Sequence, residues 1–425
     1  MATAMVFGRT GRVRRLVGPV LCLLIAAGAI ARFTTAGHGG ASRSVVARPV
    51  TPSDAAVAEA TTALRIAVET GDPARYAVVD DALARAGEAP GAVAVRAALM
   101  LSRHEFIEAR TFIASSLVAT PTDRALLTAS VDAAIETGHY DEAQDTLQRL
   151  SDVRPDGRVL SRISYLRELH GDIPGALAAM RQAEQATIDP GDRATVSTLL
   201  GDLCLANNDL VCAARSYDSA QQQRPAAANV VMGQARLLAA RGDASQATAL
   251  MVALVERSPQ PAAASLLGEL RTSAGDRAGA ENEFLLVATS TALLTSAGVT
   301  TDLEAAAFEA DRGQADRAVT LALAAYSNRH TVFTADTLGW ALTRAGRGEE
   351  ALPFVREANA LGTTSVSVQV HTAAALAATG DAAGAQASLQ QAFAGNPWSA
   401  PATRITAIDL ARMLRVDVPV HWNTA

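Results

Sequence analysis

Apolar and polar positions alternate along most of the chain with the spacing of amphipathic helices arranged in pairs. In the clearest segment, residues 197–225, Cys204 lies on a first predicted helix and Asn208 begins a turn. Ala213 and Tyr217 then share one face of a second predicted helix, because residues four apart lie on the same side of an α-helix. A proline ends the segment, as expected for a helix that stops there.

The same pattern recurs with a period near 34 residues. Aligning the copies on the small residue at the centre of each gives intervals of 33, 34, 33, 37, 34, 33, 38, 33 and 34. The central residues are Tyr76, Ala109, Ala143, Ala176, Ala213, Ala247, Ala280, Ala318, Ala351 and Ala385. The two long intervals indicate insertions, near residues 185–195 and 287–305, that lengthen a helix or a loop.

A rarer residue supports this register. Five positions before each central residue the chain has glycine eight times in ten, although glycine is only 30 of 425 residues. The ten positions are Gly71, His104, Gly138, Gly171, Asn208, Gly242, Gly275, Gly313, Gly346 and Gly380. Glycine readily takes the left-handed conformation that ends a helix, and asparagine is the next best residue there. The pattern therefore predicts about ten helical hairpins.

This order of small, turn, small, large and small residues, closed by proline, resembles the tetratricopeptide repeat (TPR) family over residues 55–397. Residues 286–313 and 336–340 also resemble a stretch of exported bacterial TPR proteins of unassigned function. The resemblance implies an all-α fold, a right-handed superhelical solenoid of about ten hairpins over residues 54–399. Residues 400–425 would add a capping helix, ending at 414, and a tail from 416.

The first 53 residues differ from the rest of the chain. Residues 1–32 hold clustered arginines and then sixteen uncharged residues, 16–31, which predicts a signal peptide or a signal anchor. Residues 33–53, rich in Gly, Ser, Thr and Pro, are typical of a flexible linker. Both readings of the N-terminal segment, cleaved or retained, involve the membrane or its export machinery. They place the body outside the cytoplasmic membrane, in the cell envelope or secreted.

Charge separates the same two parts. Positions 1–53 contain seven basic residues and no acidic residue, which gives this part a net charge of +7. Residues 54–425 contain 30 basic and 43 acidic residues, so their net charge is −13 and the total is −6. An acidic body lacks the basic face that nucleic acid requires, and we expect no nucleic-acid partner.

The sequence predicts no catalytic, cofactor or metal site. All 37 basic residues are arginine, which excludes lysine chemistry, and Gly346 and Ala351 of a G-x-G-x-x-A outline already have repeat roles. His104, His139 and His170 lie near turns of successive hairpins, too far apart to share a metal, and are expected to be solvated.

The two cysteines of the fifth copy, Cys204 and Cys212, lie on opposite sides of one turn. They fit either two small buried side chains or a disulfide across the hairpin, and the first is preferred.

The resemblance assigns the inner groove to first-helix positions fifteen, eleven and eight residues before each central alanine. The lysines of the family's chaperone-tail clamp are absent. The candidate partner-binding residues are Asp132, Tyr165, Asp202, Met232, Arg236, Glu269, Asp336 and Trp340. Acids and aromatics suit a peptide or protein segment with positive charge, although Tyr165 and Trp340 also fit packing between repeats.

The function expected is an exported or membrane-tethered, non-catalytic scaffold that binds a protein or peptide in this groove. The alternative is an α-helical solenoid hydrolase that acts on an envelope polymer, using the acids of the two insertions. Those acids are Asp189, Asp192, Asp302 and Glu304.

Overall fold

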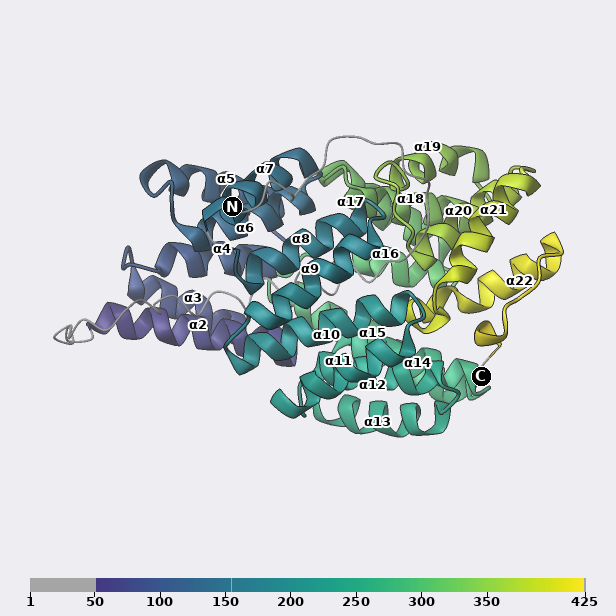
Figure 1. Ribbon diagram of the computed structural model, residues 1–425, viewed down its shortest axis with the longest axis horizontal. Helices are drawn as coiled ribbons and strands as arrows, with labels where there is room; N and C mark the ends of the chain where they lie inside the picture. The colour runs from purple at the N-terminus through teal and green to yellow at the C-terminus, as the bar shows by residue number, and fades with distance from the viewer. Residues whose placement is uncertain (1–50, 154, 424–425) are drawn as a thin grey trace.

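The computed structural model describes residues 51–153 and 155–423, and this part of the chain is all-α. Twenty of its α-helices form ten successive hairpins, as the repeat predicted, and α22 (Arg404–Leu414) follows them (Figure 1). The hairpins are α2 (Pro52–Thr70) with α3 (Ala74–Ala86); α4 (Ala92–Ser102) with α5 (Phe106–Ala119); α6 (Arg124–Glu136) with α7 (Tyr140–Val153); α8 (Gly157–Leu169) with α9 (Ile173–Ala186); α10 (Pro190–Ala206) with α11 (Leu210–Gln223); α12 (Ala228–Ala240) with α13 (Ala244–Arg257); α14 (Pro261–Ser273) with α15 (Arg277–Ser296); α16 (Asp302–Asp311) with α17 (Ala315–Asn328); α18 (Val332–Arg344) with α19 (Gly348–Ala358); and α20 (Val366–Ala378) with α21 (Ala382–Ala394).

The turn inside each hairpin confirms the predicted register. All ten predicted turn positions have a left-handed backbone, with φ between 57° and 88°. The two that are not glycine, His104 at 60° and Asn208 at 57°, accept a conformation that most side chains avoid. Each first helix thus ends where the chain must reverse, and the chain folds as an all-α solenoid.

The central position of each repeat is buried, because the two helices of a hairpin approach closely there. Nine of these residues are alanine, and the exception, Tyr76, still fits with only 5% of its surface exposed. The two insertions lengthen helices: α10 has 17 residues and α15 has 20.

The hairpins form two stacked superhelical turns of five hairpins each. The turns of hairpins 1 to 5 contact the loops that follow hairpins 6 to 10, and we call this contact the seam. Gln260 donates from Nε2 to Glu69 O (2.9 Å), and at the other end of the seam Asn396 N donates to Ala206 O (3.2 Å). The bonded residues of the seam lie about 190 residues apart, as in the pair Asn396 and Asn208 with a separation of 188.

The carbonyl groups at the C-terminal ends of α2, α4, α6 and α10 are the main acceptors of the seam. Such groups have no partner within their own helix and need an external donor. Thr300 N donates to Arg103 O (2.9 Å), and Arg329 donates from Nη1 to Glu136 O (3.1 Å). The packing is tight, because a Cβ atom at Gly138 would collide with a backbone carbonyl of the opposite loop.

Three expectations need correction: the first concerns His104, the second the two cysteines, and the third the C-terminal segment. His104 is not solvated: its Nδ1 lies 2.9 Å from Thr300 O and its ring stacks on Phe106, whereas His139 and His170 are exposed. Cys204 and Cys212 are joined by a disulfide, whereas the preferred prediction was two separate, small buried side chains.

The residues after α22 are not a tail as far as the structure describes them. Trp422 is fully buried, donates from Nε1 to Gly395 O (3.0 Å) and packs edge-on against Phe393. The segment therefore folds back over α21. The capping helix itself is present, and its Ile405 and Met413 are exposed as expected for a solvent-facing face.

The predicted signal or anchor segment 1–32, and the linker except for its last three residues, lie outside the described residues. Within 51–153 and 155–423, none of the helices combines the length and the apolar character needed to cross a membrane.

Candidate functional site: the inner face of the first helices

The predicted groove residues lie on the first helices of their hairpins, and ion pairs join several of them across neighbouring repeats. Arg162 on α8 donates from Nε to Asp132 on α6 (2.7 Å). Arg236 on α12 donates to Asp202 on α10 (3.1 Å), so two residues predicted to hold a partner hold each other instead. The groove positions thus link repeat to repeat along the inner face.

Burial changes the protonation chemistry of this row. Loss of water raises the pKa of Asp132 and Asp202, while the facing arginines act in the opposite direction. Glu269 on α14 pairs with Arg312 (2.7 Å), yet burial still raises the pKa of its carboxyl to about 7. The structure leaves Asp202, Arg236 and Glu269 no more than 9% exposed, so they are not open to solvent.

Trp340 is also buried rather than exposed on a groove, with 2% of its surface accessible. Its Nε1 donates to Asp311 (2.9 Å), and its ring stacks on His371 with centroids 4.4 Å apart. Asp336 in turn lies 3.0 Å from His371 Nδ1. Of the two readings of Trp340, packing between α16, α18 and α20 is the one the structure shows.

Tyr165 and Met232 are half-buried and pack against the hydrophobic core, Tyr165 from α8 and Met232 from α12. Contact with a partner by any of the eight predicted residues stays a prediction.

A ninth inner-face residue is more informative than these eight. Glu168 lies on α8, one turn after Tyr165, and is half-buried. Burial raises its pKa from 4.5 to about 8, and the negative charge of Asp202 adds to the rise. Among the described residues no ion pair or hydrogen bond joins its carboxyl group to a cation. Glu168 occupies the position eight residues before Ala176, which the family pattern assigns to the groove, so the sequence contained the signal.

The four acids of the alternative hypothesis, a hydrolase, lie at helix starts or beside charged groups of neighbouring helices. Asp189 caps α10 by accepting from Asp192 N (2.9 Å), and Asp192 faces Arg158 at 3.6 Å. Glu304 lies 3.4 Å from His104 Nδ1, beside the seam, and Asp302 begins α16. In the part of the chain that the structure describes, no group of three or more His, Cys, Asp or Glu residues has the arrangement of a metal site.

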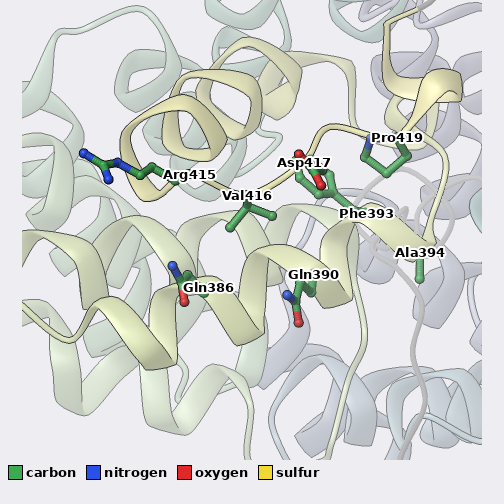
Figure 2. Close-up of a pocket in the computed structure, with 8 residues that line it drawn as sticks. All are labelled: Gln386, Gln390, Phe393, Ala394, Arg415, Val416, Asp417 and Pro419. Carbon is green, nitrogen blue, oxygen red and sulfur yellow. The ribbon is translucent and has the colours of Figure 1, made fainter.

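A cleft of about 520 Å³ lies between α21 and the segment that follows α22. Figure 2 shows Gln386, Gln390 and Phe393 on α21, with Arg415 and Asp417 on the covering segment. Gln386 is already engaged, since it donates from Nε2 to Leu414 O (2.8 Å). The cleft combines amides and charges of both signs, and its residues lie on the second helix α21 and after α22 rather than on the first helices.

No protein-family model and no curated protein matches the sequence. Solved structures similar to it include the Cut9–Hcn1 hetero-tetramer of the APC/C, with 16% identity, a TM-score of 0.43 and coverage of 84% of this chain and 76% of that chain. A tetratricopeptide repeat protein from Parabacteroides merdae has 17% identity and a TM-score of 0.34 over 61% of this chain and 98% of its own. A monomeric mutant of IFIT1 with Gppp-AAAA has 12% identity and a TM-score of 0.44 over 78% of this chain and 80% of its own.

The class of protein follows from the repeat and the ten hairpins themselves. The chain is an all-α solenoid of tetratricopeptide-like repeats, in which the first helices contact the first helices of neighbouring hairpins.

Proposed function

We propose that this protein is a non-catalytic scaffold whose inner face binds a basic segment of a protein or peptide. One observation carries the proposal: Glu168 is a desolvated carboxyl group on the inner face without a cation among its described neighbours, next to the negative Asp202. An acid that is partly removed from water in that position is costly to ionise, and a positive group brought beside it lowers the cost.

The neighbouring acids argue for the same partner chemistry. Asp132, Asp202 and Glu269 each already face one arginine, whereas Glu168 does not. An arginine or lysine side chain of a partner would complete this row of pairs. The half-buried ring of Tyr165, one helical turn away, would pack against the aliphatic part of such a side chain.

Binding of matched peptides tests the proposal. We expect peptides that contain arginine or lysine to bind the purified protein at least about tenfold more tightly than the same peptides with glutamine, as measured by fluorescence anisotropy. Glu168→Gln should remove this preference. Glu256→Gln, on the exposed face of the second helix α13, is the matched control and should leave it intact.

Proton release gives a second, independent measurement. A cation beside Glu168 favours the ionised carboxylate, so binding at pH 7 should release up to one proton. Calorimetry in two buffers of different ionisation enthalpy measures that number. Equal binding of basic and neutral peptides by the wild-type protein would refute the proposal.

We further propose that the scaffold acts outside the cytoplasmic membrane, tethered or released. The support is the arginine-rich and then apolar sequence of residues 1–32. Fractionation of the native host, with N-terminal sequencing of the recovered protein, tests the location and whether the segment is cut. Recovery of the intact chain from the cytosol would contradict it.

A further inference from the structure

Tyr217 occupies a position that the other hairpins fill with apolar residues. Hairpins 2 to 10 each bury the side chain four residues after the central one. These nine residues are Ile113, Leu147, Met180, Tyr217, Met251, Phe284, Ala322, Val355 and Leu389. Of the nine, Tyr217 alone carries a hydroxyl group. The position therefore needs an apolar side chain, and the hydroxyl group calls for a separate explanation.

Packing does not explain the hydroxyl group, because a phenylalanine packs in the same way two hairpins later. A Cβ atom at Gly201 would collide with the ring of Tyr217, and one at Gly268 would collide with the ring of Phe284. Both glycines lie twelve residues before the central residue of their hairpins. Each ring thus fills the same space against the first helix of its own hairpin, with or without a hydroxyl group.

The hydroxyl group of Tyr217 reaches an acid of the predicted groove. Tyr217 lies on the second helix α11, and its ring lies between α10 and α12, against Gly201 on one and Gly233 on the other. Its Oη donates to Asp202 Oδ1 (2.6 Å). A residue of a second helix thus fixes the carboxyl group of a first helix.

The bond to Tyr217 goes with a different contact between Asp202 and its arginine. Asp132, the equivalent residue of hairpin 3, uses both oxygens, since Arg162 donates from Nε to Oδ1 (2.7 Å) and from Nη2 to Oδ2 (2.5 Å). At Asp202, both Arg236 Nη2 and the Tyr217 hydroxyl group donate to Oδ1. No hydrogen bond or ion pair with a described residue engages Oδ2 of Asp202. The carboxylate that the tyrosine holds therefore keeps one oxygen for another donor.

This oxygen belongs to an acid that acts on Glu168. Glu168 precedes Asp202 by 34 residues, one repeat period, and lies on the preceding first helix α8. The negative charge of Asp202 adds to the rise in the pKa of Glu168. Neighbouring first helices therefore present two carboxyl groups that both have oxygens without a donor.

We propose that Tyr217 is a positioning residue of the cation site: its hydroxyl group holds Asp202 so that Oδ2 stays available, and the basic side chain of a partner is shared between Glu168 and Asp202. This names the second acid of the site, and so it rests on the function proposed above. Without the hydroxyl group, Arg236 takes both oxygens of Asp202, as the arginine of hairpin 3 does, because the planar fork of a guanidinium favours bidentate bonding. Glu168 then meets the partner's cation alone.

Tyr217→Phe in the full-length protein tests this. The variant keeps the ring that packs against Gly201, and Phe284 is the precedent for phenylalanine at this position of the repeat. We expect the preference for the basic peptide over its glutamine counterpart to fall by about fivefold in fluorescence anisotropy, with binding of the glutamine peptide unchanged. Tyr217→Met, with the residue of hairpins 4 and 6, repeats the test if phenylalanine lowers the melting temperature.

Proton release separates positioning from packing. When Asp202 turns fully to Arg236, its charge acts less on Glu168, and less of the Glu168 carboxyl group is protonated at pH 7 before binding. The basic peptide should then release fewer protons from Tyr217→Phe than from the wild type, as measured by calorimetry in the two buffers. A residue that only packs would not change this number.

Tyr326→Phe is the matched control. Tyr326 donates to Glu357 over the same 2.6 Å, between the second helices α17 and α19, so the variant loses a bond of the same kind away from the site. It should change neither the preference nor the proton count. Tyr217→Phe combined with Glu168→Gln should bind the basic peptide no more weakly than Glu168→Gln alone, because both changes act on one site.

The outcomes are distinguishable. An unchanged preference and proton count in Tyr217→Phe would overturn the positioning role and leave the proposed function standing. Equal weakening of both peptides would assign the hydroxyl group to folding alone and would overturn that role as well. Equal binding of both peptides by the wild type would instead refute the proposed function itself.

Discussion

The Glu168→Gln substitution should change how the stability of the protein depends on pH. The carboxyl group has a pKa of about 8 in the folded protein and 4.5 as its ordinary value. Between these two pH values the folded chain keeps the proton and the unfolded chain releases it. Rising pH therefore draws the equilibrium toward the unfolded state, and the wild-type protein loses stability through this window. Glutamine does not ionise. The variant therefore lacks the fall in the free energy of unfolding that ionisation of Glu168 causes as the pH rises.

The size of the effect follows from the shift. The difference, 8 minus 4.5, at about 1.4 kcal/mol per unit sets an upper limit of about 5 kcal/mol. Because the side chain is only half-buried and water screens part of its charge, we expect about 2 kcal/mol. The variant should match the wild type near pH 4 and exceed it by that amount at pH 9.

Denaturant unfolding followed by circular dichroism at pH 4, 6.5 and 9 measures this difference. Comparing the variant with the wild type cancels the titration of groups that both proteins share. Glu256→Gln, which removes an exposed carboxyl group, should show no such trend. A stability difference that stays constant over the whole range, or a variant that is less stable at pH 9, would mean that Glu168 is not desolvated as described.

Three further outcomes follow from the packing. Trp340→Ala should lower the free energy of unfolding by about 3 to 5 kcal/mol in denaturant melts, because the ring is 2% exposed. An unchanged melt would mean that Trp340 is exposed on an open groove and not packed between helices. Replacing Cys204 and Cys212 by alanine should cost about 2 to 3 kcal/mol, and thiol titration of the denatured, unreduced wild type should detect neither cysteine as a free thiol. Gly313→Ala should cost about 1 kcal/mol from its left-handed backbone alone, whereas Gly138→Ala should lower the melting temperature further since its Cβ also collides with the opposite loop; equal losses would contradict the seam.

The fold could be predicted because its determinants are local and recur. A turn such as Gly242 needs a left-handed residue whatever surrounds it, and the close approach at Ala247 needs a small one, so both repeat at a fixed spacing. The bond between Asp202 and Arg236, 34 residues apart, also follows one repeat period, yet the sequence alone does not distinguish an internal pair from two partner contacts.

The remaining features depend on how hairpins far apart in the chain are brought together. The contact of His104 with Thr300 spans 196 residues and results from a small rotation at each repeat, summed over five hairpins. A slightly different rotation would leave His104 in solvent, as expected from its place in a turn. The burial of Trp422 depends in the same way on the path of the chain after α22, for which the repeat carries no information.

The seam changes how this solenoid responds to stretching. Repeat proteins whose units touch only their neighbours behave as springs, which lengthen and widen by small changes at each interface. Here, pulling the ends apart must first break bonds such as those from Gln260 to Glu69 O and from Arg329 to Glu136 O. The seam therefore fixes the diameter of the inner face. A partner bound there, as we propose, would have to be threaded along it as an extended chain or would have to open the seam to enter from the side.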